Sequence, residues 1–405
     1  MDDSPLPLIL VGASVRAAAR SARRAGFAPW AIDLFGDVDL RDETRTVLVC
    51  RNLADDLVRL WPRTPRAPWL YTGGLENDPD LLDQLADSRR LLGNDGDVVR
   101  AVRDPRQLQT ALAAAGFAAL DVRIGDDPPA AGRWLRKPLR SAGGLRMVSY
   151  DAELQPAERR DDCYFQEHLP DSAATFGATF VMNAREARLL GVCRHLPIVA
   201  LVPTAPTVAS AISPYQYGGA SAWQPPDDAR QELERLGHFL AARFKLRGVV
   251  GVDVGYVARE QVESRQAAKW FVLEVNPRFP ASAQLLDDVA PTSVVGLHIQ
   301  AARDGRLPAP VHIRPATPAA AQVAYAPSNF TWSSTLARRW LEMRPISTDL
   351  VANLADVPAP QTPIQLGQPL CTFVLRGSDS RLVEQQLAIW MLNCLESLRA
   401  FESPG

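Results

Sequence analysis

Two apolar segments of the chain, residues 248–257 and 270–275, each carry one carboxylate inside a run of aromatic and β-branched residues. Such residues favour strands, and Pro277 ends the second run because it has no N–H for a strand ladder. The polar residues 258–268 join the two segments. We therefore predict an antiparallel hairpin of two buried strands with a long loop.

The acidic side chains of this hairpin are predicted to hold a metal ion. Glu274 and Asn276 lie two residues apart, so they would point to the same face of a strand, and Asp253 on the neighbouring strand would face the same place. Their oxygens suit Mg²⁺, which often completes its shell with substrate phosphates. The alternative is two ordinary core strands with a surface ion pair. A charge in an apolar strand is costly unless it is paired or bound to a metal, which favours the metal site.

Asp253 followed by Glu274-Val-Asn276-Pro-Arg278 resembles the metal-binding end of the ATP-grasp superfamily, whose ligases join a carboxylate to an amine or thiol. In that family, an acid on one strand and Glu-x-Asn on the next hold one or two Mg²⁺ ions against the phosphates of ATP. The resemblance implies ATP and Mg²⁺, or Mn²⁺ in its place, as cofactors. The resemblance covers residues 95 to 300, with weaker likeness in the flanks. Within the superfamily, the chain is most similar to the branch of predicted ATP-dependent carboligases related to biotin carboxylase.

A basic strand and a glycine turn precede the acids. Residues 133–138 end in Lys137-Pro, and Ser141-Ala-Gly143-Gly144 follows. Glycines let a loop turn its N–H groups toward an anion, and the lysine adds a point charge. The pattern resembles the family's Ile-Lys-Pro strand and glycine-rich flap, which implies phosphate contacts for all four residues. Alone, Ser-x-Gly-Gly is usual in a hairpin turn; the order of the motifs favours the flap.

Two predicted helices, residues 97–103 and 105–115, stand where the family begins its first nucleotide-binding lobe. A lysine there usually reaches the phosphates of ATP, and the resemblance implies that Arg103 takes its place. Arginine binds phosphate well. The alternative is a solvated arginine.

Residues 163–169 resemble the family's hinge between lobes, where backbone groups bind adenine and an acid binds ribose. The resemblance implies nucleotide contacts for Gln166, Glu167, His168 and Leu169. His168 occupies a variable position, and a lone histidine is more often a satisfied interior side chain than a catalyst.

Arg278 leaves the strand after Pro277, so we predict that it faces the cleft and grips an acyl phosphate. The alternative is a salt bridge to Asp253 or Glu274. Arg278 and Lys137 are our candidate catalytic residues. The resemblance implies that a carboxylate takes the γ-phosphoryl group of ATP, that an amine or related nucleophile displaces phosphate, and that ADP and phosphate are released. This chemistry needs no protein nucleophile.

The N-terminal segment predicts a β-α-β unit, with strands at 8–11 and 31–35 and a helix at 15–25. Asp33 follows Gly12 at a spacing that invites an NAD-binding interpretation. However, Ser14 and Ala17 occupy the positions where G-x-G-x-x-G requires glycine. We therefore favour the half-Rossmann domain that precedes the nucleotide site in ATP-grasp enzymes over an NAD-dependent oxidoreductase.

Glu76 and Asn77 follow a predicted strand at 69–71. Carboxyl ends of parallel strands face the ligand crevice, which makes both residues substrate-site candidates. A helix N-cap region before residues 79–86 is an equally good interpretation.

The fold class that follows is α/β with α+β lobes. We predict a half-Rossmann domain at 1–94, an ATP-grasp domain at 95–305 with two lobes hinged near 166–170, and a small C-terminal α+β domain at 306–405. The C-terminal prediction rests on strands at 321–326 and 370–375 and a helix at 380–401, after the proline-rich residues 308–318.

The charge balance and cysteines bound the setting. Lys plus Arg is 44 and Asp plus Glu is 46, so there is no basic excess for a nucleic-acid backbone. The five cysteines contain no C-x-x-C, which favours buried thiols in a cytoplasmic protein over disulfides or zinc. We expect no signal peptide, no membrane span, small carboxylate and amine-type substrates, and compatibility with a homodimer. A non-catalytic ATP-binding sensor of the same fold is the main rival function.

Overall fold

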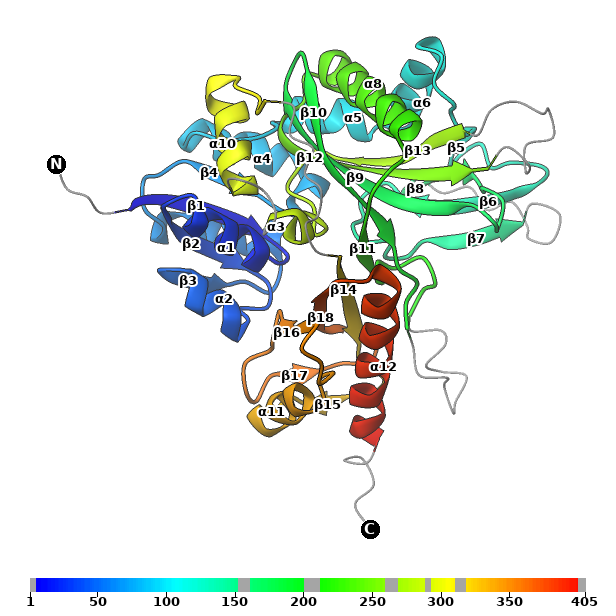
Figure 1. Cartoon of the computed structure of the whole chain (residues 1–405). Helices are drawn as coiled ribbons and strands as arrows, with labels where there is room; N and C mark the ends of the chain where they lie inside the picture. Colours follow the sequence, from blue (N-terminus) through cyan, green and yellow to red (C-terminus); the bar gives the residue numbers. More distant parts are fainter. Residues whose placement is uncertain are drawn as a thin grey trace.

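The computed structural model describes residues 5–151, 161–199, 212–258, 269–287, 293–309 and 318–399. The N-terminal unit is a parallel sheet in the order β3-β2-β1-β4, drawn in blue in Figure 1. Its strands are β1 (Leu6–Gly12), β2 (Phe27–Asp33), β3 (Thr46–Val49) and β4 (Trp69–Tyr71). Its helices are α1 (Arg16–Arg24), α2 (Val38–Glu43), α3 (Leu53–Leu60) and α4 (Pro79–Ser88), with 3-10 turns at Trp61–Arg63 and Leu75–Asn77.

Strand β2 differs from the expected range of 31–35, since it begins at Phe27 and ends at Asp33. The parallel ladder with β1 carries it through Pro29, which pairs in register with Leu8. It ends because the Asp33 carboxylate accepts the N–H groups of Phe35 and Gly36 and so turns the chain. Tertiary pairing thus extends a strand that its local sequence would shorten.

A long antiparallel sheet of eight strands runs through the molecule, in the order β13-β12-β9-β10-β11-β14-β18-β16. The first five are β9 (Ala174–Asn183), β10 (Ala187–His195), β11 (Gly219–Trp223), β12 (Arg247–Val257) and β13 (Lys269–Asn276). The rest are β14 (Ala319–Tyr325), β16 (Leu350–Ala355) and β18 (Pro369–Gly377). β11 pairs with β14, so the sheet runs across the domain boundary predicted at residue 305.

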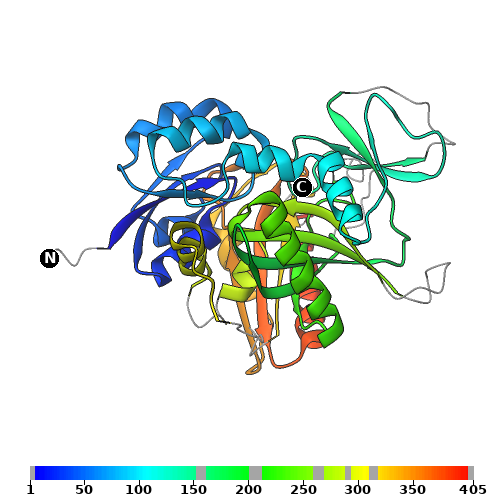
Figure 2. The same cartoon turned by 90° about the horizontal axis from the view of Figure 1, so that it is seen from above.

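A second antiparallel sheet, in the order β5-β8-β6-β7, forms a small lobe beside β13 (Figures 1 and 2). Its strands are β5 (Val122–Ile124), β6 (Arg133–Pro138), β7 (Val148–Asp151) and β8 (Cys163–Glu167). The neighbouring helices are α5 (Gly96–Arg103), α6 (Pro105–Ala114) and α8 (Asp227–Phe244). Asp95 caps α5 and Asp104 caps α6, because each side chain accepts an N–H of the first turn.

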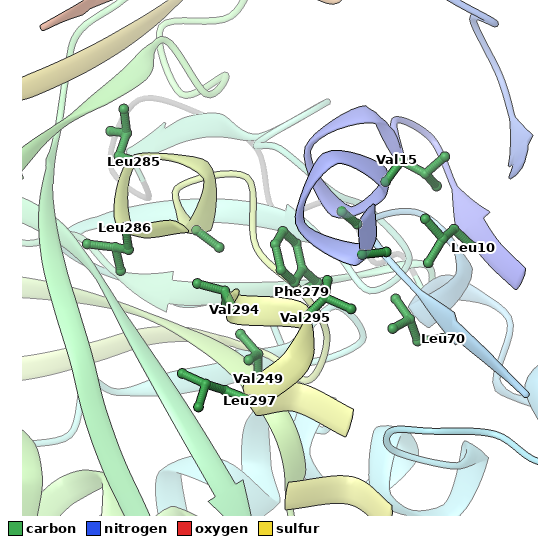
Figure 3. Close-up of a cluster of buried hydrophobic side chains, with 14 of the residues drawn as sticks. Leu10, Val15, Leu70, Val249, Phe279, Leu285, Leu286, Val294, Val295 and Leu297 are labelled. Carbon is green, nitrogen blue, oxygen red and sulfur yellow. The ribbon is translucent and has the colours of Figure 1, made fainter. Parts of the chain in front are cut away.

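A buried apolar cluster joins the N-terminal unit to the long sheet (Figure 3). Leu10 and Leu70 come from the parallel sheet and Val249 from β12, with Phe279 between them. The remaining wall comes from α9 (Ala283–Asp287) and α10 (Val294–Asp304). This cluster packs the parallel sheet against the long sheet.

The C-terminal part packs α12 (Ser380–Arg399) on strands β14 and β18, around Trp340, Phe373 and Trp390. It also contains α11 (Ser334–Glu342) and a small pairing of β15 (Phe330–Thr331) with β17 (Pro363–Ile364). Among the helices that the structure describes, none combines the length and apolar character needed to cross a membrane.

Candidate functional site

The predicted hairpin is confirmed as an antiparallel pair, with Asp253 of β12 opposite Glu274 of β13. The register is irregular just after Asp253, at the step to Val254. Asn276 Nδ2 donates a hydrogen bond to Asp253 Oδ2 at 3.0 Å, and Asn276 Oδ1 accepts one from Arg278 Nη2 at 3.0 Å. The acid, the amide and the arginine therefore form one connected edge at the end of the two strands.

The oxygens on this edge fit a hard cation. Asp253 Oδ1 lies 3.5 Å from His195 Nε2, and Glu274 Oε1 lies 3.8 Å from Arg103 Nη2, which are longer separations than in hydrogen-bonded ion pairs. Burial raises the pKa of Glu274 despite the opposing charges of Lys137 and Arg103. No cluster of three His, Cys, Asp or Glu side chains suited to a metal occurs in the described part of the chain. A Mg²⁺ ion held here would need phosphate oxygens and water to complete its shell, as is usual for this ion.

Lys137 on β6 reaches across to the long sheet. Its Nζ donates to Gln166 Oε1 at 3.1 Å and to the Leu273 carbonyl at 3.2 Å, and it lies over the Tyr164 ring. Burial alone would lower the pKa of Lys137, but the charges of Tyr164 and Glu274 outweigh it and raise that pKa. The ammonium is therefore a charged group held at the boundary between lobe and sheet.

The glycine turn after β6 is held by a second loop. Gly143 and Gly144 both have positive φ, at 61° and 73°. Tyr217 N–H donates to the Gly143 carbonyl at 3.0 Å, and Ser213 Oγ donates to the Met147 carbonyl at 2.9 Å. Residues 212–217 therefore pack against the predicted flap.

Arg103, at the end of α5, is mostly buried among three different parts of the molecule. Its Nη2 donates to the Ser141 carbonyl at 2.8 Å, and its Nη1 donates to Asn77 Oδ1 at 2.9 Å. With Glu274 at 3.8 Å, the guanidinium contacts the flap, the N-terminal unit and the strand-end edge of Asp253, Glu274 and Asn276, called the metal edge below for its predicted role. The solvated alternative for Arg103 is wrong, because its side chain is only 13% exposed.

The predicted hinge residues take different positions. Gln166 is buried and turned toward Lys137, whereas Glu167 is exposed and accepts the Asp121 N–H through Oε2 at 3.2 Å. His168 lies against Tyr215, with Nε2 3.4 Å from the Tyr215 hydroxyl. Leu169 packs on the backbone of Gly255, where an added Cβ would clash with it.

Arg278 has a partner that neither sequence alternative named. Its Nε donates to Glu76 Oε1 at 3.0 Å, and the Glu76 side chain is only 1% exposed. Burial alone would lower the pKa of Arg278, but Glu76 and Glu274 outweigh it and raise that pKa. The carboxylate in direct contact is thus Glu76 from the turn after β4, in place of Asp253 or Glu274.

His195 is the main polar residue of this edge that the sequence did not indicate. It ends β10 and points at Asp253, and an added Cβ on Gly177 would meet both side chains. The signal in the sequence was the alternation of β10, since Cys193 and His195 share one face.

A cavity opens between the small lobe, α5, α6 and β13. It is lined by Lys137, Ser141, Gly144, Arg103 and Glu274 on the polar side, together with Tyr164 and Gln166. Apolar residues complete it, among them Leu108, Leu120, Leu139, Met147 and Val272. Such a combination of an apolar wall with a few converging charges suits a nucleotide.

The NAD interpretation receives no support from β1 and β2. Both oxygens of Asp33 accept backbone N–H groups, from Val15, Phe35 and Gly36, so the carboxylate is occupied within the fold. Packing explains why residue 12 is glycine, because an added Cβ would lie 1.9 Å from Thr72 Oγ1.

The model of the ATP-grasp domain matches residues 118–282. No curated protein matches the chain. Among solved structures, the ADP complex of N5-carboxyaminoimidazole ribonucleotide synthetase aligns with a TM-score of 0.69 at 13% identity, over 98% of this chain and 100% of that one. A biotin carboxylase–β,γ-ATP complex from Campylobacter jejuni gives 0.68 at 11% identity, over 96% and 95%. An L-amino acid ligase from Bacillus licheniformis gives 0.65 at 12% identity, over 95% and 98%.

These alignments extend over nearly the whole chain, well beyond the matched domain. The expected fold class is therefore confirmed. The matched domain spans the flap, the hinge and the metal edge. Residues 118–282 thus match an ATP-grasp domain, and the chain has the fold of solved ATP-grasp ligases and biotin carboxylase.

Proposed function

We propose that this chain is a Mg²⁺-dependent ligase that activates a carboxylate as an acyl phosphate and joins it to an amine or related nucleophile, releasing ADP and phosphate. One observation carries the proposal: Arg103, Lys137 and Glu274 line the same cavity, and Arg278 follows directly along the metal edge. The arrangement concentrates cations and metal-ligand oxygens where the outer phosphates of ATP would lie.

Each residue has a separate task in this proposal. Lys137 and the flap residues Ser141, Gly143 and Gly144 bind the phosphates, and Arg103, which is hydrogen-bonded to the Ser141 carbonyl, binds them beside the flap. Asp253, Glu274 and Asn276 would hold Mg²⁺, or Mn²⁺ in its place. The metal would neutralise phosphate charge during phosphoryl transfer. Gln166, Glu167, His168 and Leu169 border the nucleoside end.

Arg278 orients the carboxylate and stabilises its acyl phosphate. Arginine presents a planar fork that matches a carboxylate or phosphate group in two hydrogen bonds. Because the fork interacts with charge that develops during the reaction, it contributes to turnover more than to ATP affinity. The nucleophile then attacks the acyl carbon, phosphate leaves, and the amine proton passes to solvent.

The products follow from the position of the cations. They gather around the outer phosphates, so the γ-phosphoryl group is the one stabilised in transit, which favours ADP and phosphate over AMP and pyrophosphate. We further infer small-molecule substrates, a cytoplasmic setting and compatibility with a homodimer. The buried state of all five cysteines supports a reducing compartment.

The test begins with ATP turnover in fractionated metabolite pools, followed by phosphorus NMR of the products. We expect ADP and phosphate in one fraction, and no product with Lys137→Ala at the same ATP concentration. Calorimetry should show a raised dissociation constant for ATP in that variant. Pyrophosphate among the products would refute the mechanism.

A non-catalytic ATP sensor of the same fold is the second candidate. It would bind ATP with Mg²⁺ and yet turn over ATP in no fraction. Retention of Asp253, Glu274, Asn276 and Lys137 favours the enzyme, because a sensor needs affinity alone.

A further inference from the structure

The turn that follows β4, residues 73–77, touches both arginines of the site. Glu76 Oε1 accepts a hydrogen bond from Arg278 Nε at 3.0 Å, and Asn77 Oδ1 accepts one from Arg103 Nη1 at 2.9 Å. We propose that Glu76 and Asn77 are positioning residues, with Glu76 orienting the fork of Arg278 and Asn77 that of Arg103. The tasks of the two arginines rest on the proposed function, whereas these contacts do not.

The Glu76 carboxylate depends on Arg278 for its charge compensation. Its side chain is 1% exposed, and its second oxygen, Oε2, is buried with no hydrogen-bond partner in the part of the chain that the structure describes. A buried carboxylate without a cation is strongly unfavourable. Moving Arg278 away from Glu76 would therefore leave a buried carboxylate uncompensated, which keeps the two side chains together.

The remaining contacts of Arg278 fix which N–H groups stay available. Nε is used by Glu76, Nη2 donates to Asn276 Oδ1 at 3.0 Å, and Nη1 donates to the Phe279 carbonyl at 3.4 Å. A guanidinium carries five N–H groups. Within the described residues, each terminal nitrogen thus keeps one N–H for a ligand, and a bidentate contact with an anion uses two N–H groups.

The N-terminal unit also anchors the backbone on both sides of Arg278. The Pro277 carbonyl accepts hydrogen bonds from the Tyr71 hydroxyl at 3.1 Å and from Asn94 Nδ2 at 2.9 Å. On the other side, Phe279 is buried in the apolar cluster between the two units (Figure 3). Backbone and fork are therefore held together by the same docked unit.

Asn77 fixes the orientation of the Arg103 guanidinium, as Glu76 fixes that of Arg278. The other terminal nitrogen of Arg103 donates to the Ser141 carbonyl at 2.8 Å, so the guanidinium is fixed between the turn and the flap. Because Glu76 and Asn77 are adjacent, one short turn sets the spacing of the two guanidiniums. A salt bridge that merely docked the unit would need neither Asn77 nor this adjacency.

Three variants test the assignment. Glu76→Gln keeps the shape of the side chain and removes its charge, Asn77→Ala removes the contact to Arg103, and Glu342→Gln on the exposed end of α11 is the matched control. For each we would measure ATP affinity with Mg²⁺ by calorimetry, ADP formation in the active fraction, the melting temperature, and the Arg278 Nε–H signal by NMR, assigned with Arg278→Lys.

We expect Glu76→Gln to lower ADP formation about tenfold or more while the dissociation constant for ATP changes less than about twofold. The Arg278 Nε–H signal should shift in that variant. Asn77→Ala should instead raise the dissociation constant for ATP several-fold. A purely structural role would change affinity and turnover together with the melting temperature.

Unchanged ADP formation and an unchanged Arg278 signal in Glu76→Gln would overturn the assignment. If Glu76→Gln does not fold, Glu76→Asp, which keeps the charge on a shorter side chain, should still shift the signal and lower turnover. If the wild-type chain neither binds ATP nor forms ADP, the proposed function fails. The Arg278 signal then decides the positioning alone, since it must shift in Glu76→Gln if Glu76 holds the fork.

Discussion

Two buried arginines border the N-terminal unit, and they have opposite surroundings. Arg278 contacts one carboxylate, Glu76, and an amide, Asn276. Arg16, at the start of α1, contacts Asp356 at 2.8 Å and Asp39 at 3.3 Å. The first lies at the candidate active site, and the second joins the N-terminal unit to the end of β16.

The difference lies in how the negative charge is balanced. Near Arg278, Glu76, Asp253 and Glu274 face three cations, since Lys137 and Arg103 stand nearby. Around Arg16 there are four aspartates, because Asp33 and Asp37 lie close enough to Asp356 to interact with it electrostatically. Burial raises the pKa of Asp33 to about 6 and that of Asp37 to about 8.

Backbone N–H groups and hydroxyls take the place of cations at the second junction. Asp39 accepts the N–H groups of Asp356 and Val357, and Asp356 accepts the hydroxyl of Thr372. Such fixed donors serve a closed structural contact. A set of cations beside a cavity serves a negatively charged ligand. We therefore expect Arg16 to matter for stability and Arg278 for activity.

The largest expected effect is on stability, at Arg16. Arg16→Met removes the cation while Asp39 and Asp356 stay in place, so the free energy of unfolding should fall by about 3 kcal/mol. Urea denaturation measures it. ATP affinity of the folded variant should be unchanged. Arg59→Met, on the exposed pair with Asp56, is the control and should have little effect. A stable Arg16→Met with weakened ATP binding would reverse the comparison.

The next effect is on activity, at Glu274. Glu274→Gln should lower Mg²⁺-dependent ADP formation by about 100-fold, because it removes a metal-ligand charge from the reacting end of the cleft. The melting temperature should hardly change, since the side chain is 31% exposed. Glu186→Gln, on an exposed turn, is the matched control. Activity equal to that control would remove Glu274 from the metal edge.

The sequence predicted what depends on local pattern. The β12 and β13 hairpin and the strand that ends in Lys137-Pro both follow from apolar pattern and turn residues. The pairing of Asp253 with Glu274 followed because adjacent antiparallel strands in one hairpin have few possible registers.

Contacts between distant segments were not predictable in this way. Glu76 is 202 residues from Arg278, and their meeting depends on how the N-terminal unit docks. The pairing of β11 with β14 likewise joins Gly219 to Gln322, so the long sheet crosses a boundary that proline content suggested. The division into domains at 1–94, 95–305 and 306–405 stays a prediction. The assigned roles of the site residues also stay predictions.

A smaller effect separates two neighbouring flap glycines. An added Cβ on Gly144 would lie 1.8 Å from the Tyr215 carbonyl oxygen, whereas one on Gly143 would meet nothing within 4 Å. Both have positive φ, so each alanine also costs roughly 1 kcal/mol in backbone strain. Gly144→Ala should weaken ATP binding about tenfold, and Gly143→Ala markedly less. Calorimetry distinguishes them, and equal losses would mean that the contact with residues 212–217 does not matter.

The smallest expected effect is a pH dependence at the Arg16 junction. Asp37 is 4% exposed, and Asp356, Asp33 and Asp39 act on it in the same direction as burial, while Arg16 opposes them. The folded state therefore keeps a proton up to about pH 8, whereas the unfolded chain loses it near 3.8. Between these values the folded state binds more protons, so this part of the stability is complete below pH 3.8 and lost as the pH rises to about 8.

Asp37→Asn cannot ionise, so its stability relative to wild type should increase with pH. We expect a relative gain on the order of 1 kcal/mol between pH 6 and pH 8, below the maximum for one proton because the neighbouring aspartates share the charge. Urea denaturation of both proteins across this range measures the difference, in which groups distant from Asp37 cancel. ATP affinity should stay the same at each pH. If the stability difference between Asp37→Asn and wild type were constant with pH, Asp37 would not titrate in this range in the folded protein. The charge balance at Arg16 would then not differ from that at Arg278, and only the geometry of the two sites would.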